Sequence, residues 1–471
     1  MSFSVAGQEV VVVGGARSGV AAAELLYERG AHVTLTDSRT DAFEGADHLR
    51  DLGVDVELGP HRESLLLEAD LVVLSPGVPP DQPALQAARR KGVPVIGEIE
   101  LASRWLTGRV VAITGTKGKS TTTTLTARML AAGGLDVTAG GNLGTPLSTQ
   151  VAASRVEAIH VVEVSSFQLE TTDRFHPWIS VLVNLSPDHL DRHATFDEYA
   201  GAKARIFANQ TPDDWAVINA DDPASLALAR GIRAQRFDFA LQAAVPNGIT
   251  VQDGTIVERG ATGSTELMPV SAVKLPGRHL LADVLAASAV ARLAGVAPAA
   301  IRTAVESFEG LEHALQRVVE IGGVEFVNDS KATNVVSARR AIESLGQGVV
   351  PIMGGRYKGG DFADLHEVLR AHATAVVAIG EAADRIETAV KDVVPVARAG
   401  SMRDAVRRAF GLATPGGTVV LAPACSSFDM FTDYAARGRA FVDEVKALAA
   451  EHTRTAAGKD GAAAVGRQRK G

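Results

Sequence analysis

The sequence predicts a three-domain α/β protein, and three observations lead to this fold class. The chain has 471 residues, about three times the ~150 residues of a common domain. Apolar runs of strand length alternate repeatedly with helical patterns, and glycine-rich turns follow many of these runs. Hydrophobic residues make up 46% and charged residues 22% of the chain, which is typical of globular proteins and excludes a fibrous or wholly disordered chain.

The first domain, residues 1–108, is predicted to be Rossmann-like. A β-branched run at 9–13 ends in a glycine turn, and a helical pattern covers 20–29. Further apolar runs at 32–36 and 71–74 continue the alternation of strand and helix. Such an alternation builds a doubly wound parallel sheet, which binds ligands at the carboxyl ends of its strands.

The second domain, residues 109–312, is predicted to be an α/β domain of the P-loop ATPase type with a small antiparallel part. A strand runs into TGTKGKST at 114–121, where a helix begins, and buried-looking strands follow at 160–164 and 179–184. Asp253-Gly254 separates two alternating runs, which is typical of a hairpin with a two-residue turn.

The third domain, residues 313–452, is predicted to be Rossmann-like as well. Four apolar strands with helical stretches between them support this prediction: 324–329, 348–355, 374–380 and 418–423. Residues 453–471 lose apolar periodicity, and we expect a disordered tail there.

Charge and composition restrict the partners and the location. Lys and Arg number 47 against 55 Asp and Glu, a net charge of −8 that disfavours a general nucleic-acid binder. The single cysteine, Cys425, allows no internal disulfide, which suits a reducing compartment. No run of ~20 apolar residues is present. We therefore expect a cytoplasmic protein with no nucleic-acid partner and no membrane insertion.

The loop at 114–121 is predicted to bind a nucleoside triphosphate. Its backbone N–H groups and the helix dipole would face a polyphosphate, which Lys119 would neutralise, while Ser120 would ligate Mg²⁺. The alternative is a glycine-rich turn without a ligand. The candidate nucleotide-binding residues all lie in this loop: Gly115, Thr116, Lys117, Gly118, Lys119, Ser120 and Thr121.

The glycine turn at 14–19 matches a dinucleotide-binding motif incompletely, because alanine stands at position 16. A strand still feeds a helix whose first N–H groups can hold a phosphate, and Asp37 ends the second strand, where a ribose or base would lie. The alternative is an ordinary tight turn of a parallel sheet.

Two charged side chains stand where core residues are expected. Glu163 lies near the carboxyl end of an apolar strand, and its carboxylate either faces Mg²⁺ or is a solvated edge residue. Lys203 follows a capping box at 195–198 and shares an apolar helix face with Tyr199 and Phe207. The lysine is either desolvated, with a lowered pKa and a reactive neutral amine, or its stem extends the amine to solvent.

Taken together, six segments resemble the Mur ligases. The resemblance runs from about residue 9 to about residue 446, with the segments in the same order as in that family. They are TGTKGKST (114–121), EVSSFQLE (163–170), NLSPDHLDRH (184–193) with Lys203 beyond it, FVNDSKATN (326–334), MGGRYKG (353–359) and APACSSFDMF (422–431).

The resemblance implies an ATP-dependent amide ligase of peptidoglycan synthesis, of the branch that adds D-glutamate to UDP-N-acetylmuramoyl-L-alanine. ATP would phosphorylate the substrate carboxylate, the glutamate amine would attack the acyl phosphate, and phosphate would leave. We expect a monomer whose three domains hold the UDP moiety, ATP and the amino acid. The alternatives are the same chemistry with L-glutamate, another Mur or folylpolyglutamate-type acceptor, and a catalytically silent nucleotide-sugar binding protein.

The resemblance also implies the roles of single residues. Lys119, His189 and Lys203 would be catalytic, and Lys203 would be carbamylated so that its new carboxylate helps to place the metal. Two Mg²⁺ ions are expected, with Ser120 and Glu163 at one and His189 at the other. Asp329 and Lys331 would join the loop residues at ATP. The residues expected at the UDP substrate are Arg17, Ser18, Asp37, Ser38, Arg39, Gly77 and Asn142. Those expected at glutamate are Thr333, Lys358, Ser427, Phe428 and Tyr434.

Three positions depart from the family pattern, and all of them concern the nucleotide. Leu280 and Asp283 stand in place of two asparagines on the adenine side, and Ala314 follows His313 in place of an arginine. We hypothesise that Arg317 replaces this arginine, provided that its segment is helical.

Overall fold

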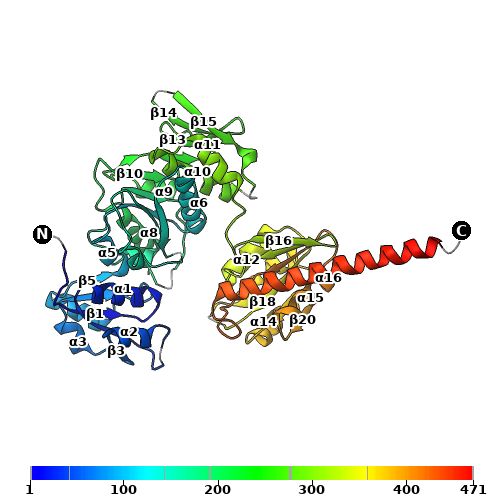
Figure 1. The fold of residues 1–471 in the computed structure, drawn as a ribbon, viewed down its shortest axis with the longest axis horizontal. Coiled ribbons are helices and arrows are strands. Elements are labelled where there is room, and N and C mark those ends of the chain that lie inside the picture. The colour runs from blue at the N-terminus through cyan, green and yellow to red at the C-terminus, as the bar shows by residue number, and fades with distance from the viewer. Residues whose placement is uncertain are drawn as a thin grey trace. The chain divides into compact units, whose positions relative to one another are not determined.

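The computed structural model describes residues 3–41, 43–142, 144–189, 192–261, 263–274, 278–357 and 359–468. The chain divides into two compact units, Met1–Phe308 and Glu309–Gly471. The first unit contains two parallel sheets and a small, mostly antiparallel one, and the second unit contains one mixed sheet (Figure 1). Within the described residues, no helix has both the length and the apolar character that crossing a membrane requires.

The N-terminal sheet is entirely parallel and has the order β3-β2-β1-β4-β5. Its strands are β1 (Glu9–Val13), β2 (His32–Asp37), β3 (Asp55–Leu58), β4 (Leu71–Leu74) and β5 (Val95–Gly97). Its helices are α1 (Arg17–Glu28), α2 (Ala46–Leu52), α3 (Glu63–Glu68), α4 (Pro83–Lys91) and α5 (Glu98–Ser103). Strand β1 is a continuous apolar run because both of its faces are covered. A Cβ at Gly19 would overlap the carbonyl oxygen of Gly14, so glycine allows α1 to start close against β1.

The central sheet is also parallel, with the order β11-β10-β9-β6-β8-β7. Its strands are β6 (Arg109–Thr114), β7 (Val137–Gly141), β8 (Ile159–Glu163), β9 (Ile179–Leu182), β10 (Trp215–Ile218) and β11 (Gln235–Arg236). The helices of this part are α6 (Lys119–Ala132), α7 (Ser166–Leu169), α8 (Phe196–Ala204), α9 (Pro223–Leu228), α10 (Arg278–Leu293) and α11 (Pro298–Glu306). Helices α6 and α10 pack against each other, which brings α10 to the start of α6.

A small sheet in the order β12-β13-β14-β15 adjoins the central one. Its strands are β12 (Asp238–Ala240), β13 (Gly248–Gln252), β14 (Thr255–Gly260) and β15 (Gly263–Pro269). The predicted hairpin is confirmed: Gln252 pairs with Thr255 around Asp253 and Gly254, which have φ values of 48° and 75°. The antiparallel part of the predicted second domain is therefore present.

The single carboxylate of Glu100 on α5 connects the N-terminal sheet region to the central one. Its Oε2 accepts the backbone N–H groups of Asp173, Arg174 and Phe175 at 2.8, 3.0 and 2.9 Å. Its Oε1 accepts Arg104 Nε at 2.8 Å, and the carboxylate is fully buried. Charge-assisted hydrogen bonds of this kind hold a loop of one sheet region against a helix of the other.

The sheet of the second unit has the order β16-β17-β21-β18-β19-β20, and its only antiparallel pair in the described chain is β16 with β17. Its strands are β16 (Gln316–Ile321), β17 (Val324–Asn328), β18 (Val349–Gly354), β19 (Val376–Ile379), β20 (Val396–Ala399) and β21 (Thr418–Leu421). Its helices are α12 (Val335–Ser344), α13 (His366–His372), α14 (Ala383–Val390), α15 (Met402–Leu412) and α16 (Tyr434–Gln468). All four predicted strands of this region are present.

The structure differs from the sequence expectations at both ends of this unit. Helix α16 continues to Gln468 and covers most of the segment for which a disordered tail is predicted. That segment lacks apolar periodicity, but it is rich in alanine, whose helix propensity is the highest. Arg317 lies on strand β16, so the expectation that its segment is helical is wrong. Its side chain is 70% exposed and forms an ion pair with Glu325 at 2.9 Å.

Candidate active site

The phosphate loop connects the end of β6 to the start of α6. Gly118 has a left-handed φ of 79°, which turns the chain so that the first N–H groups of α6 point away from the helix. Lys119 folds back over the loop, and its Nζ donates to the carbonyl oxygens of Gly115 and Thr116 at 3.0 Å each. The N–H groups of a helix start, the helix dipole and an ammonium group at one place fit a polyphosphate.

Two residues predicted to hold Mg²⁺ are in contact beside this loop. Ser120 Oγ donates to Glu163 Oε2 at 2.7 Å, and Asn142 Nδ2 donates to Glu163 Oε1 at 2.8 Å. Glu163 ends β8, next to β6 in the sheet, and is only 3% exposed. Hydroxyl and carboxylate oxygens are the donors that Mg²⁺ prefers, so these residues fit the ion. In the described chain no three His, Cys, Asp or Glu side chains form a cluster that could hold a metal.

Lys203 is buried at the same edge of the sheet. It lies on α8 with 1% of its surface exposed, its Nζ donates to Thr114 Oγ1 at 3.3 Å, and it lies 4.8 Å from the centre of the Tyr199 ring. Burial, reinforced by the charge of Lys119, lowers the pKa of Lys203 to about 6 against the opposing effect of Asp188 and Glu163. The amine is therefore neutral at pH 7, and the alternative in which it extends to solvent is wrong.

His189 lies on the loop after β9 in a positive-φ conformation, with φ of 53°. Its ring is 4.9 Å from the ring of Phe167 and 6.4 Å from that of Tyr199. Within the described residues, no hydrogen bond joins the His189 side chain to Ser120 or Glu163. The second Mg²⁺ site expected at His189 thus stays a prediction.

In the N-terminal sheet, Asp37 closes the glycine turn. Its Oδ2 accepts the Gly15 N–H at 2.6 Å, and its Oδ1 accepts the Arg39 N–H at 2.9 Å and Arg39 Nε at 2.8 Å. Arg39 Nη2 returns a bond to the Gly15 carbonyl oxygen at 3.1 Å. The hydrogen bonds from Arg39 lower the pKa of Asp37 to about 2 in spite of its burial. Asp37 is thus committed to the turn. Of the other residues predicted to contact UDP, Ser18 is half-buried, and the exposed ones are Arg17, Ser38, Arg39, Gly77 and Asn142.

In the second unit, the loops that follow three neighbouring strands are joined by backbone hydrogen bonds. Ala424 N–H donates to the Ala332 carbonyl at 2.9 Å, and Arg356 and Ser426 exchange both of their backbone bonds. The residues predicted to bind glutamate are carried by these loops or by the start of α16. Ser427 is buried, Thr333 and Tyr434 are half-buried, Phe428 is 57% exposed, and Lys358 lies outside the described residues.

Asp329 and Lys331 follow β17 on one of these loops. Asp329 is 9% exposed, and its Oδ1 accepts the Leu315 N–H at 3.1 Å. Burial raises the pKa of Asp329 to about 7, although the Leu315 N–H and the charge of Lys331 oppose the rise. Within the second unit, this carboxyl group is therefore balanced between its two protonation states at neutral pH.

Sequence reasoning missed one residue of this region, Arg437 on α16. It is 2% exposed, and its guanidinium donates hydrogen bonds to Ser330 and Cys425 on the loops after β17 and β21 and to Gly354 at the end of β18. Burial lowers its pKa to about 10. A lone arginine in a polar helix is typical of a solvated face, so no pattern in the sequence indicates this position.

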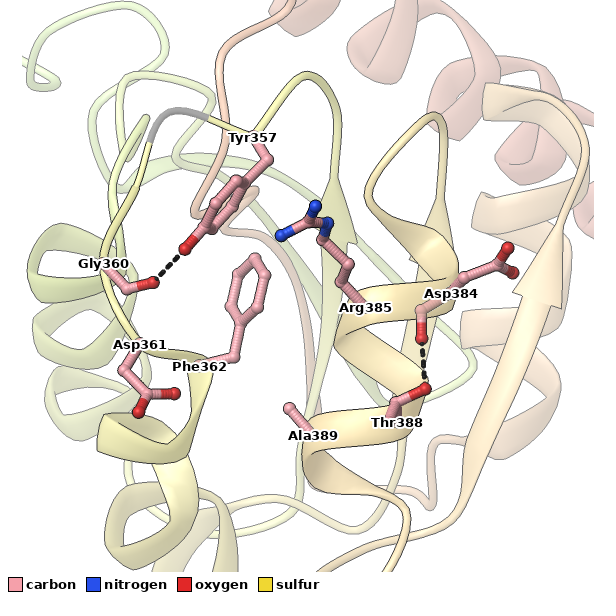
Figure 2. Close-up of a pocket in the computed structure, with 8 residues that line it drawn as sticks. All are labelled: Tyr357, Gly360, Asp361, Phe362, Asp384, Arg385, Thr388 and Ala389. Carbon is pink, nitrogen blue, oxygen red and sulfur yellow. Dashed lines mark hydrogen bonds between the residues drawn. The ribbon is translucent and has the colours of Figure 1, made fainter.

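A cavity of about 380 Å³ lies between the loop after β18 and helix α14 (Figure 2). The Tyr357 hydroxyl donates to the Gly360 carbonyl at 2.6 Å, and the Arg385 guanidinium lies 4.8 Å from the centre of the Tyr357 ring. The Phe362 ring is tilted against that of Tyr357 at 5.6 Å. The described residues predicted to bind glutamate do not line this cavity: Thr333, Ser427, Phe428 and Tyr434.

Comparison with known proteins places the chain in a family. Three family models match in chain order: the Mur ligase MurD-like N-terminal domain over 8–97, the Mur ligase middle domain over 113–291, and the Mur ligase glutamate ligase domain over 313–425. The chain is 44% identical over 449 residues to a UDP-N-acetylmuramoylalanine–D-glutamate ligase of Koribacter versatilis, which covers 95% of this chain and 99% of the relative. It is 46% identical over 445 residues to the protein of the same name from Acidobacterium capsulatum, which covers 94% and 96%.

Solved structures show the same fold at lower identity. The UDP-N-acetylmuramate–alanine ligase MurC of Thermotoga maritima has a TM-score of 0.58 and 19% identity, covering 94% of this chain and 100% of that one. A pseudomurein peptide ligase type C of Methanothermus fervidus has a TM-score of 0.56 and 17% identity, covering 93% and 99%. The predicted α/β class with three domains is confirmed, and the matches over nearly the whole chain show that it belongs to the Mur ligase family.

Proposed function

We propose that this chain is the ATP-dependent ligase that joins D-glutamate to UDP-N-acetylmuramoyl-L-alanine in peptidoglycan synthesis. One observation carries the proposal: the phosphate loop, the Ser120–Glu163 pair and the buried Lys203 meet at one sheet edge. They do so in a chain that is 44% identical, over 95% of its length, to a ligase of that name. A carboxylate is a poor acyl donor until a phosphoryl group turns its oxygen into a leaving group, so a triphosphate site is what this reaction needs.

The residues of the central domain divide the work of phosphoryl transfer. The N–H groups that start α6 bind the phosphates, and Lys119 balances the charge of the group that is transferred. A bound Mg²⁺, held by Ser120 and Glu163, would supply further neutralisation of phosphate charge. The neutral amine of Lys203 is the form that reacts with CO₂, so carbamylation of Lys203 is part of the proposal. His189 at a second Mg²⁺ ion is a further part of it.

The remaining roles complete the proposal. The domains are 1–108, 109–312 and 313–452, and they hold UDP, ATP and glutamate respectively. The UDP substrate lies along the turn held by Asp37 and Arg39 and extends to Asn142, whose amide already contacts Glu163. Glutamate lies at the strand-end loops of the second unit. In this proposal the enzyme acts as a cytoplasmic monomer.

Phosphate release with purified protein tests this function. UDP-N-acetylmuramoyl-L-alanine and MgATP are supplied with D-glutamate, with L-glutamate or without an amino acid. We expect release only with D-glutamate. Release with L-glutamate alone would identify the L-specific alternative, and no release with either amino acid would overturn the proposal.

A further inference from the structure

Asp283 packs directly against the phosphate loop. It lies on α10, is 3% exposed, and fills the space that a side chain at Gly118 would occupy. A Cβ at Gly118 would overlap Asp283 Oδ1 and lie 2.9 Å from its Cγ, closer than real Cβ atoms approach. Gly118 is the left-handed residue from which α6 starts, so the carboxyl group of Asp283 supports the turn whose N–H groups face the nucleotide.

The described cations near Asp283 have other partners. Among residues whose side chains the structure describes, four cations lie on α10 or on the elements that pack against it. Lys119 bonds to loop carbonyls, Arg128 lies over the Phe308 ring, and Arg292 and Arg302 pair with Glu258 and Glu306. Across the described residues, no ion pair to Asp283 is recorded. Burial therefore raises the pKa of Asp283 well above its usual range, with Thr122 as the opposing polar neighbour.

An ionised carboxylate would be unfavourable at this place for two reasons. It would be a buried charge with no ion-pair partner among the residues that the structure describes, and it would lie behind a loop that binds a polyanion. A protonated carboxyl group offers one O–H donor and one carbonyl acceptor in the same planar shape as a carboxamide, which has an N–H₂ donor and a carbonyl acceptor. The neutral acid can thus do what an asparagine does here.

We infer that Asp283 is a positioning residue of the phosphate loop that works as a neutral acid, equivalent to a carboxamide. The inference rests on the proposed function, because it assigns the loop to a nucleotide polyphosphate. A neutral aspartic acid differs from asparagine by one atom of the side chain, and the buried environment keeps the group uncharged.

The test compares Asp283→Asn with Asp283→Ala, using Asp238→Asn as a matched control. Asp238 is a partly buried carboxyl group on β12, and it is ion-paired to Arg236. ATP affinity is measured by calorimetry in Mg²⁺ buffer between pH 6 and 9. We expect Asp283→Asn to bind within about twofold of wild type and Asp283→Ala to bind at least about tenfold more weakly, while Asp238→Asn is unchanged. The inference is overturned if Asp283→Ala binds like wild type, or if Asp283→Asn loses more than half as much binding free energy as Asp283→Ala.

The second measurement is the free energy of unfolding without nucleotide, which does not depend on enzymatic activity. A carboxyl group whose pKa is raised on folding binds a proton more tightly in the native state, so its contribution to stability falls as pH rises above the unfolded value of 3.8. An asparagine does not titrate, so its contribution to stability does not change with pH. We expect the free energy of unfolding of Asp283→Asn to exceed that of wild type by an amount that grows with pH from about 4 upward. A difference independent of pH overturns the neutral state. If wild type binds no ATP at all, the proposed function fails, but this pH comparison still decides the state of Asp283.

Discussion

The Arg437 guanidinium holds Ser330 by both of its oxygen atoms: Nε donates to the hydroxyl at 3.0 Å, and Nη2 donates to the carbonyl oxygen at 2.9 Å. Its Nη1 donates to the Cys425 carbonyl at 3.1 Å. Ser330 follows β17 and Cys425 follows β21, and both loops carry residues proposed to bind glutamate. One buried cation, bonded to neutral oxygen atoms, thus sets the spacing of two binding loops.

Replacing Arg437 by leucine should loosen these loops. The buried carbonyl oxygens would lose their donors, each at a cost of about 1–3 kcal/mol, so we expect roughly 3 kcal/mol less local stability. The three tryptophans all lie in the first unit, so the measurement is hydrogen exchange in 329–333 and 424–428, with the KM for D-glutamate alongside it. The control is Arg439→Leu, which changes an exposed arginine two residues further along the same helix. Unchanged exchange in both loops would show that Arg437 does not organise them.

The sequence predicted the parts of the site that local spacing determines. The positions of Gly118, Lys119 and Ser120 between a strand and a helix predict a phosphate loop, and the spacing of Lys203 from Tyr199 predicts an apolar helix face. The sequence left open whether the Lys203 amine is buried or reaches solvent, and the structure shows that it is buried. The contacts between distant segments could not be predicted in this way. That Asp37 would close its own turn depends on where the Gly15 N–H points in the folded chain.

Arg437 and Asp283 show the same limit more strongly. Arg437 meets Ser330 across 107 residues of chain. Asp283 meets Gly118 only because α10 packs on α6. Both are residues with ionisable side chains on helices, where the sequence pattern alone is typical of a solvated position, and only the packing of the elements reveals their burial.

Asp37→Asn should destabilise the N-terminal domain at neutral pH. The carboxylate accepts hydrogen bonds from the Gly15 N–H and from the Arg39 guanidinium, and an asparagine cannot accept both. We expect the free energy of unfolding to fall by about 1–2 kcal/mol. Most of this loss should come from the Gly15 bond, because Arg39 is half-exposed. The pKa of Asp37 is lowered to about 2 on folding, so its contribution is complete above the unfolded value of 3.8 and disappears as pH falls toward 2. Unfolding followed by Trp105 fluorescence should show the two proteins converging in acid. Asp47→Asn, at a 90% exposed carboxylate, serves as the control.

Glu163→Gln should separate nucleotide binding from phosphoryl transfer. The amide keeps the size of the side chain but removes the charge that suits Mg²⁺. We expect the affinity for ATP without Mg²⁺ to stay within about twofold of the wild-type value. The rate of Mg²⁺-dependent phosphate release should fall by about 100-fold or more. The exposed Glu157→Gln is the control. A variant with normal release at saturating Mg²⁺ would exclude Glu163 from the metal site.

Lys203→Ala should abolish phosphate release while leaving ATP binding nearly intact, because the amine lies behind the loop and bonds to Thr114 rather than to the loop carbonyls. If carbamylation supplies a carboxylate at this position, small carboxylic acids such as formate should restore part of the lost rate in this variant.

The wild-type protein offers a second test of Lys203, through the pH dependence of its reactivation. The pKa of Lys203 is about 6, so the reactive neutral amine is lost as pH falls below 6, and bicarbonate-dependent reactivation of CO₂-depleted enzyme should slow by about tenfold for each further pH unit. Lys446→Ala, at an exposed lysine, should match wild type in every assay. Full activity of Lys203→Ala without added acid would show that this buried amine has no part in the reaction.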